Sequence, residues 1–366
     1  MRNTFGQNLT LTLFGESHGP AVGAVLDGLS PGIPVSEEEI ASRLARRRPD
    51  GAAGTARREA DRFQIVSGVF SGRTTGTPLC ILIPNEDVSS SDYESWRGLA
   101  RPGHADYSAF CKYHGFEDYR GGGHFSGRLT AALVAAGGIL IPALSARGIR
   151  IGSHILRCAG IQDRSFSDPG ADFDALEEAP FPVLDPSAAE RIRAAVEAAG
   201  AAGDSVGGVS ETAVTGVPAG IGEPWFDTLE GVLAHALFSI PAVKSVSFGD
   251  ASSMTDAKGS EWNDLFRAEE GSVVTETNHN GGINGGISNG MPLRFSCIVK
   301  PTPSVAIPQK TVDFRDGSEA VLQIRGRHDP SVLPRAIPVL NSVTALVLAD
   351  FLIGRFGTDY LRFDSI

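Results

Sequence analysis

The chain has 366 residues, of which 42% are hydrophobic and 20% charged, and these values exclude a disordered or fibrous chain. Its formal charge of −11 at pH 7 excludes a general nucleic-acid binder, which needs a basic face to neutralise phosphates. The four cysteines are scattered and the longest apolar stretch (129–146) is broken by glycine and proline, so we expect a cytoplasmic protein without a membrane span.

Helices and strands alternate irregularly along the chain. Cap residues and apolar spacing predict helices over residues 36–47, 130–147, 188–199, 228–239 and 338–356. Apolar runs predict strands over 9–14, 22–26, 65–69, 79–83, 209–214, 245–248 and 293–299. The segment 163–185, rich in Asp, Pro and Phe, predicts a long surface excursion. This order favours an α+β fold class, and because no linker divides the chain we expect one domain over residues 1–366.

Two pairs of segments resemble each other in the same order. Residues 22–33 resemble 206–221, and the glycine-rich stretch 68–79 resembles 282–293. This order predicts an internal duplication with pseudo-twofold symmetry and a site at the seam. Chance similarity between glycine-rich turns is the alternative.

Four short segments combine glycine with histidine or arginine. They are residues 15–19 (GESHG), 101–106 (RPGHAD), 119–128 (YRGGGHFSGR) and 325–330 (RGRHDP). Guanidinium groups pair bidentately with phosphate and carboxylate, and glycines before a helix leave backbone N–H groups free to bind an oxyanion. Taken alone, the first segment is equally consistent with a structural histidine and the fourth with an Asp-Pro helix start, whereas the aromatics and arginines of the third disfavour a mobile surface loop. Together the segments indicate a site for a compact anion. Cysteines, histidines and acidic residues lack zinc or calcium spacing, so a metal is not indicated.

In this order the four segments resemble the signature blocks of the chorismate synthase family. Residues 46–49, 74–78 and 280–283 also fit, and the resemblance extends from about Asn8 to Asp350. It implies a layered β-α-β sandwich, a homotetramer and a carbon–oxygen lyase of the shikimate pathway to aromatic amino acids. The implied reaction is the anti-1,4-elimination of phosphate from 5-enolpyruvylshikimate 3-phosphate to give chorismate, with reduced FMN and no net redox change.

The resemblance also implies roles for matching residues. His18 would protonate the departing phosphate, His104 would protonate the reduced flavin near N1, and Asp329 would accept the proton relayed through flavin N5. The implied substrate-binding residues are Arg47, Arg101 and Arg128. The implied flavin-binding residues are His124, Phe125, Ser126, Pro241, Ala242, Gly285, Lys300, Pro301, Thr302, Pro303, Ser304 and Arg327.

Three departures from the family pattern bear on these roles. Residues 51–54 lack an arginine that some members carry, for which Arg57 or Arg58 could substitute, Asn341 replaces a frequent glutamate, and residues 124–125 replace small polar residues or arginine. No reductase-like segment is visible, so we expect an external flavin reductase to supply reduced FMN. A flavin-binding or redox-sensing protein without the elimination is the alternative, whereas a kinase-like enzyme is disfavoured because the Walker lysine is missing.

Overall fold

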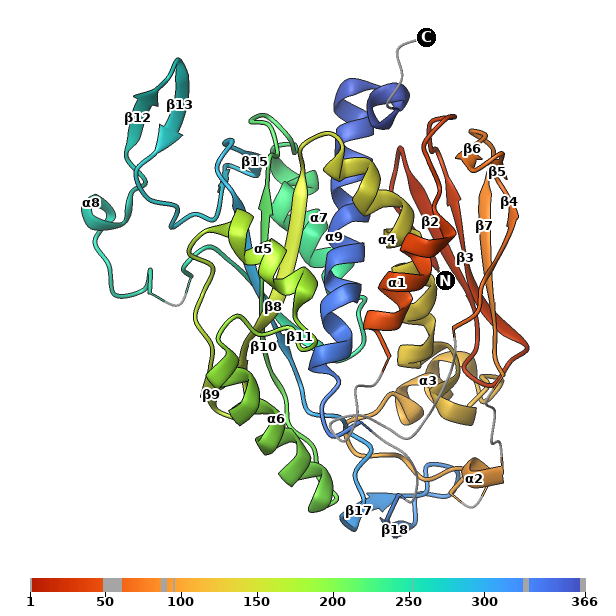
Figure 1. Cartoon of the computed structure of the whole chain (residues 1–366). Helices are drawn as coiled ribbons and strands as arrows, with labels where there is room; N and C mark the ends of the chain where they lie inside the picture. The colour runs from red at the N-terminus through yellow and green to blue at the C-terminus, as the bar shows by residue number, and fades with distance from the viewer. Residues whose placement is uncertain are drawn as a thin grey trace.

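Two five-stranded sheets face each other across a layer of helices in the computed structural model, which describes residues 2–48, 61–86, 91–94, 96–251, 253–324 and 329–362 (Figure 1). In spatial order the first sheet contains β1 (Thr4–Phe5), β2 (Thr10–Gly15), β3 (Ala21–Asp27), β7 (Leu79–Pro84) and β4 (Gln64–Ser67). The second contains β11 (Val243–Phe248), β16 (Leu293–Val299), β10 (Gly208–Thr215), β8 (Arg150–Cys158) and β9 (Ile161–Gln162). All pairings are antiparallel. Antiparallel sheets with separate helices confirm the predicted α+β class.

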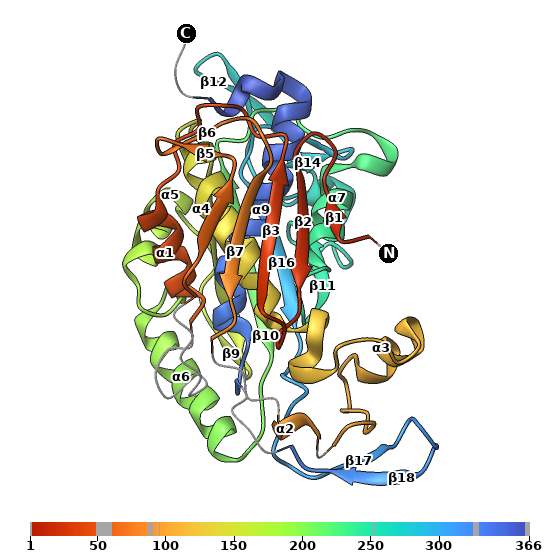
Figure 2. The same ribbon diagram turned by 90° about the vertical axis from the view of Figure 1, so that its right-hand side faces the viewer.

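The helices α4 (Thr130–Ser145) and α9 (Leu333–Phe356) run through the middle of the molecule, and α1 (Glu37–Arg46) and α7 (Leu229–Leu237) pack beside them (Figures 1 and 2). Their close packing depends on glycine, because a methyl group on Gly137 would overlap Ser342 of α9 and one on Gly138 would lie 2.8 Å from Ile40 of α1. Residues 127–145 and α9 are long and apolar enough to cross a membrane. Their apolar windows are nevertheless 89% and 83% buried inside the protein, as expected of core helices.

All five predicted helices are present, and the main differences lie at their ends. Ser36 caps α1 through a hydrogen bond from Glu39 N, as predicted. The helix α6 (Pro186–Ala201) and α9 begin two and five residues before their predicted starts. In both, a proline lies in the first turn, where its missing N–H leaves no helical hydrogen bond unmade.

The seven predicted strands are also present, but β8 was not predicted. Its sequence, RIGSHILRC, intersperses arginine, serine and histidine among apolar residues, and two of its polar side chains, Ser153 and His154, are buried. A polar residue in the middle of a strand obscures the apolar run from which buried strands are recognised.

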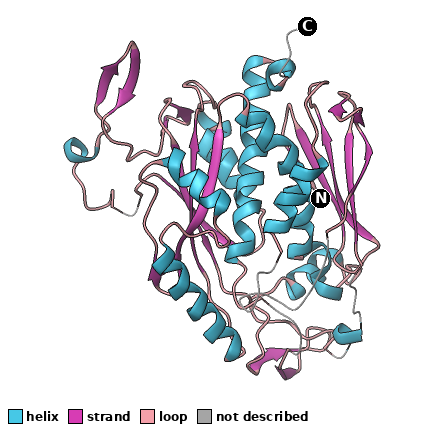
Figure 3. Cartoon of the chain, viewed as in Figure 1, coloured by secondary structure: helices cyan, strands magenta, loops and turns pink. Residues whose placement is uncertain are grey.

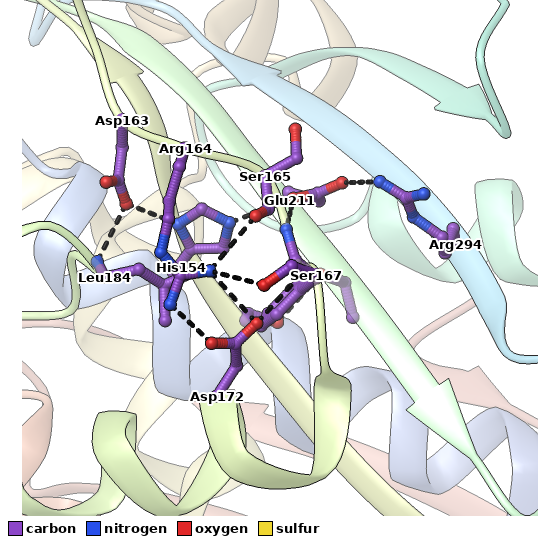
Figure 4. Close-up of polar contacts among 12 residues, drawn as sticks. His154, Asp163, Arg164, Ser165, Ser167, Asp172, Leu184, Glu211 and Arg294 are labelled. Atoms are coloured by element: carbon purple, nitrogen blue, oxygen red, sulfur yellow. Dashed lines mark hydrogen bonds and ion pairs between the residues drawn. The ribbon is translucent and has the colours of Figure 1, made fainter.

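The expectation of a long surface excursion over 163–185 is wrong for most of that segment. It contains the helix α5 (Pro169–Glu178), capped by Asp168, which packs on the outer face of the second sheet (Figure 3). His154 of β8 lies beneath it, with Nδ1 2.9 Å from Asp163 and Nε2 3.0 Å from Glu211 of β10 (Figure 4). These buried contacts hold the segment to the sheet.

Short elements and hairpins complete the described part of the chain. The helices are α2 (Ser91–Glu94), α3 (Asp106–Tyr113) and α8 (Gly259–Trp262), with 3₁₀ turns η2 (Arg120–Phe125), η3 (Gly127–Leu129), η4 (Trp225–Asp227) and η5 (Thr358–Leu361). The hairpins are β5 (Val69–Phe70) with β6 (Arg73–Thr74), β12 (Phe266–Glu269) with β13 (Ser272–Thr275), β14 (Ile283–Asn284) with β15 (Ile287–Ser288), and β17 (Gln309–Val312) with β18 (Glu319–Leu322). The β12–β13 and β17–β18 hairpins project from the body (Figure 1).

Candidate functional site

Several predicted site residues lie at one end of the first sheet. There β2 ends at Gly15 and β3 begins at Ala21, which pairs with Pro84 at the end of β7. The strand β4 runs antiparallel to β7 and begins at this same end. Because antiparallel neighbours begin where the others finish, the turn at 16–20, the residue after β7 and those before β4 share one edge.

The three glycines 121–123 lie against the turn at 16–20. Ser17 N donates to Gly123 O over 3.1 Å, and His124 Nδ1 lies 2.8 Å from Gly15 O. All three glycines have positive φ angles, between 53° and 84°. A methyl group on Gly121 would overlap the imidazole of His18, and the corresponding position on the middle glycine is 3.3 Å from the imidazole of His104. The structure therefore brings the two predicted catalytic histidines to a single loop.

The carboxylate of Asp106 orients His104. Asp106 Oδ1 lies 2.7 Å from His104 Nδ1 and 2.6 Å from Arg101 NH2, while its Oδ2 accepts a bond from Arg101 Nε over 2.7 Å. Arg101 NH2 is also 2.9 Å from the same imidazole nitrogen, but a guanidinium only donates. We therefore assign the His104 Nδ1 proton to its bond with the carboxylate, which leaves Nε2 facing the glycine loop.

Burial sets the charge of this histidine. It lowers the pKa of His104, as do the nearby Arg101 and Lys300, and the opposing effect of Asp106 does not cancel them. Burial would raise the pKa of Asp106, but the bonds from Arg101 and His104 outweigh it and hold that pKa well below its usual range. His104 is therefore neutral and Asp106 ionised near pH 7.

The predicted flavin-binding stretch 300–304, which follows β16, reaches the same turn. Lys300 Nζ donates to Gly103 O, and Arg101 NH1 lies 3.4 Å from Ser304 Oγ. Lys300 N donates to Ala242 O over 2.9 Å, so the predicted pair 241–242 adjoins this stretch. Thr302 Oγ1 is buried and has no hydrogen-bond partner among the residues that the structure describes. A buried hydroxyl without a partner fits a polar ligand at this place.

Two predicted substrate-binding arginines are held by residues that we did not predict. Arg47 NH2 lies 2.9 Å from Asp61 Oδ2, and Arg128 NH1 is bonded to Asp61 Oδ1. Arg128 Nε also donates to Asn85 Oδ1 over 2.9 Å. Burial lowers the pKa of Arg47 to about 10, despite the neighbouring carboxylate. The signal in the sequence that could have found them was their position, because Asn85 closely follows the predicted strand 79–83 and Asp61 shortly precedes the predicted strand 65–69.

Asp329, the third predicted catalytic residue, is linked to Arg47 through Arg335. Arg335 NH1 is bonded to Asp329 Oδ2, and Arg335 Nε donates to Arg47 O over 3.0 Å. Asp329 Oδ1 is buried and lacks a hydrogen-bond partner within the described part of the chain. It lines a cavity of about 130 Å³ together with Arg335 and Asn341, whose Oδ1 accepts a bond from Ser153 Oγ over 2.6 Å.

Other predicted residues are less closely connected to the histidines. Phe125 is 39% exposed, and Ser126 Oγ donates to Ser17 Oγ over 3.2 Å. Gly285 lies between β14 and β15 with a φ of 63°, and no described atom lies within 4 Å of where its side chain would begin. Arg327, Arg57, Arg58 and residues 51–54 lie outside the described residues. Over the described ranges, no three His, Cys, Asp or Glu residues could hold a metal ion.

Known proteins resemble this chain over almost all of its length. The profile of the chorismate synthase family matches residues 9–353. The chorismate synthase of Aeropyrum pernix is 46% identical over 355 residues, which cover 97% of this chain and 93% of that protein. That of Thermococcus gammatolerans is 48% identical over 351 residues, covering 96% and 97%. A crystal structure of a chorismate synthase matches with a TM-score of 0.76 at 29% identity and covers 97% of this chain and 94% of its own. The chain belongs to the chorismate synthase family.

Proposed function

We propose that the end of the first sheet, with its three-glycine loop, is the place where this chain performs the reaction of its family. That reaction is the elimination of phosphate from 5-enolpyruvylshikimate 3-phosphate to give chorismate, a step in aromatic amino acid biosynthesis. The observation that carries the proposal is the contact of His18 and His104 with adjacent glycines of one loop. Two imidazoles against one loop, with Arg101 beside His104, fit an anionic substrate that loses an anionic group.

The family depends on a flavin, and when bound a reduced flavin supplies a ring that donates an electron and accepts hydrogen. The residues around His104 fit such a group. Arg101 and Lys300 supply positive charge, and Thr302 Oγ1 supplies a buried hydroxyl without a described partner. His104 Nε2 is the atom that would exchange a proton there. An anion beside it would raise the pKa of His104 and favour the protonated form.

The remaining roles fall to residues beyond the glycine loop. His18 would donate a proton to the departing phosphate, since it is 8% exposed and lies at the predicted anion site. Asp329 would accept a proton at Oδ1, the oxygen that its bond to Arg335 leaves available. Arg47 and Arg128 would hold the substrate's anionic groups.

The layered arrangement supports an internal duplication, which we also propose. Thr74 Oγ1, in the β5–β6 hairpin, accepts a hydrogen bond from Ile33 N over 2.9 Å, and Ser288 Oγ, in the β14–β15 hairpin, accepts one from Ile221 N over 2.9 Å. Each hydroxyl then donates to the carbonyl three residues before its isoleucine. The strand orders β2-β3-β7-β4 and β8-β10-β16-β11 also correspond. Chance similarity between turns does not explain matching bonds at matching places. An experimental structure whose halves fail to superpose would remove this proposal.

We also propose an assembly and a cellular setting for this chain. A cytoplasmic homotetramer that receives reduced FMN from an external flavin reductase suits the family reaction. Exposed aromatic side chains support the tetramer, because Trp225 is 84% and Phe226 is 95% exposed in the single chain. Large exposed aromatic residues are enriched where subunits meet.

An anaerobic assay tests the function and its cofactor together. Purified protein, reduced FMN and 5-enolpyruvylshikimate 3-phosphate are mixed, and chorismate absorbance and free phosphate are followed. We expect the two products in equal amounts and no net oxidation of the flavin. Flavin binding without either product would instead favour the alternative of a flavin-binding protein that lacks the elimination. Oxidised FMN with NADPH, in place of reduced FMN, should yield no chorismate if reduction is external.

A further inference from the structure

The two arginines proposed to hold the substrate already face a carboxylate of the protein itself. Asp61 bridges them, with Oδ2 2.9 Å from Arg47 NH2 and Oδ1 bonded to Arg128 NH1. The side chain of Asp61 is 1% exposed, and those of the arginines are 3% exposed. Two buried positive charges and one buried negative charge leave a net charge of one. Removing one member of such a group leaves an uncompensated buried charge.

On one side, this bridge supports the turn that carries His18. Besides its bond to Asp61, Arg128 donates from Nε to Asn85 Oδ1 over 2.9 Å. Asn85 Nδ2 in turn donates to Glu16 O over 3.0 Å and to Gly19 O over 2.8 Å, which lie on either side of His18. A displacement of Arg128 would therefore be transmitted to the histidine through two hydrogen bonds.

On the other side, the bridge supports Asp329. Arg47 O accepts a bond from Arg335 Nε over 3.0 Å, and Arg335 NH1 is bonded to Asp329. Asp61 thus lies between two of the residues proposed to move protons. Burial by itself would raise the pKa of Asp61, but Arg47 and Arg128 outweigh it and lower that pKa, so the group is ionised near pH 7.

We propose that Asp61 is a positioning residue of the reaction, the shared counter-ion that fixes Arg47 and Arg128 in place and limits their combined charge. The proposal rests on the function proposed above. With the carboxylate present, the arginines are held at fixed positions relative to His18 and Asp329. With the pair limited to one net positive charge, the site attracts an anionic substrate and still releases the phosphate product. A neutral residue at position 61 would remove this shared counter-ion, so an external anion would pair more strongly with the two buried guanidinium groups.

The test is the variant Asp61→Asn, which keeps the shape of the side chain and removes its charge, with inorganic phosphate as the probe. We expect a lower melting temperature without phosphate and a larger rise in melting temperature on adding it. The apparent dissociation constant for phosphate should fall roughly tenfold, as the coupling between close buried charges implies. The turnover number should fall as well, because phosphate leaves slowly and His18 is displaced.

Two further variants sharpen the result. Asp172→Asn removes a carboxylate of similar burial that pairs with Arg164 on the outer face of the second sheet, so it should change neither phosphate affinity nor turnover. Asp61→Glu keeps the charge and should retain the parent's phosphate affinity while lowering turnover. If Asp61→Asn does not fold, Asp61→Glu still tests the proposal, because a parent-like turnover number for Asp61→Glu would overturn it.

A failure of the role proposed for Asp61 can be distinguished from a failure of the proposed function. Phosphate affinity in Asp61→Asn that is unchanged or weaker overturns the role of Asp61, as does tighter phosphate binding with unchanged turnover. Failure of the parent protein to form chorismate overturns the proposed function, whereas the melting experiment with phosphate does not depend on turnover.

Discussion

His104 and Asp106 form a hydrogen-bonded pair in which the aspartate orients the imidazole and partly opposes the lowering of its pKa by burial. The imidazole is proposed to donate a proton, so replacing it should impair chemistry more than binding. We expect His104→Ala to lower the turnover number about 100-fold or more, in the range typical of general acid catalysis. Affinity for reduced FMN, measured by fluorescence or calorimetry under anaerobic conditions, should change much less. Equal turnover in variant and parent would contradict the role assigned to His104.

The charge of Asp106 should also affect how turnover depends on pH. Asp106 raises the pKa of His104, while burial, Arg101 and Lys300 lower it. Asp106→Asn removes the only one of these effects that favours the protonated imidazole, so the pKa of His104 should fall further. Because the proton donor is lost as pH rises through its pKa, the alkaline decline of turnover should move to lower pH. A pH profile that keeps its position in Asp106→Asn would show that this carboxylate does not act on the catalytic proton.

Gly121 is the residue whose backbone conformation most directly affects the site. Its φ of 60° is costly for other residues, by roughly 1–2 kcal/mol, and a methyl group there would overlap the His18 ring. We expect Gly121→Ala to lower both the melting temperature and the turnover number. Gly127→Ala is the matched control, because this nearby glycine lacks a positive φ and no described atom lies within 4 Å of its added methyl. A Gly121→Ala enzyme with parental turnover would argue against a close contact with His18.

Part of the site could be predicted from its residues alone and part could not. The histidines and arginines stand beside glycines, so their chemistry is visible in the sequence. Asp61 and Asn85 carry no such mark, because the pairing of β4 with β7 brings them to one edge, and their partner Arg128 comes from a distant part of the chain. A single sequence does not specify which aspartate faces which arginine.

At the scale of elements, the segment 163–185 shows how a buried ion cluster adds to a small apolar contact, which Phe166, Phe173 and Leu176 make with the sheet. Its helix α5 has few apolar side chains, so the composition indicated a loop, although Asp168 and Pro169 are a good helix start. The segment is held through His154, whose ring lies between Asp163 and Glu211, while Arg294 bonds to Glu211 over 2.6 Å (Figure 4). Both ring nitrogens face carboxylates, so both must donate and the imidazole is positively charged.

This cluster makes the docking of the segment dependent on pH. Burial would lower the pKa of His154, but hydrogen bonds to Asp163 and Glu211 outweigh it and raise that pKa. A raised folded-state pKa gives stability that is complete below the unfolded value, about 6.5, and is lost as pH rises through the folded value. The pKa values of Asp163 and Glu211 are lowered despite burial, so their contribution is lost in acid instead.

Hydrogen exchange measures this docking directly. Amides of residues 163–184 should exchange faster in the parent as pH rises above neutrality, after correction for the intrinsic pH dependence of exchange. In His154→Gln these amides should be less protected at pH 6, by about 2 kcal/mol for the loss of charge-assisted hydrogen bonds, and should not respond to pH further. Protection that is equal in variant and parent at pH 6 would show that the ion cluster does not hold the segment.

At the scale of the whole molecule, the α+β class followed from the mixture of elements, whereas the way the two sheets enclose the helices did not. The layering came only from resemblance, because nothing local to β8 indicates that it pairs with β10, about 60 residues further along. The central helices α4 and α9 were predictable, since they are apolar all round, and such helices lie in the core of large domains. The described residues on the outer surface form no comparable apolar pattern in the sequence from which subunit contacts could be predicted.

The exposed pair Trp225 and Phe226 is where the proposed tetramer can be tested. Trp225 has a φ of 72°, a conformation rare for residues other than glycine, and such strain persists where the surroundings compensate for it. In a single chain both side chains are largely exposed, so burial against another subunit would provide that compensation.

We expect the parent to be tetrameric by light scattering and Phe226→Ser to shift toward smaller species, because burying a phenylalanine contributes about 1.5–3 kcal/mol at each interface. Glu190→Ser, an exposed change on α6, should leave the mass unchanged. A Phe226→Ser protein that stays tetrameric on dilution would place the subunit contact elsewhere on the surface.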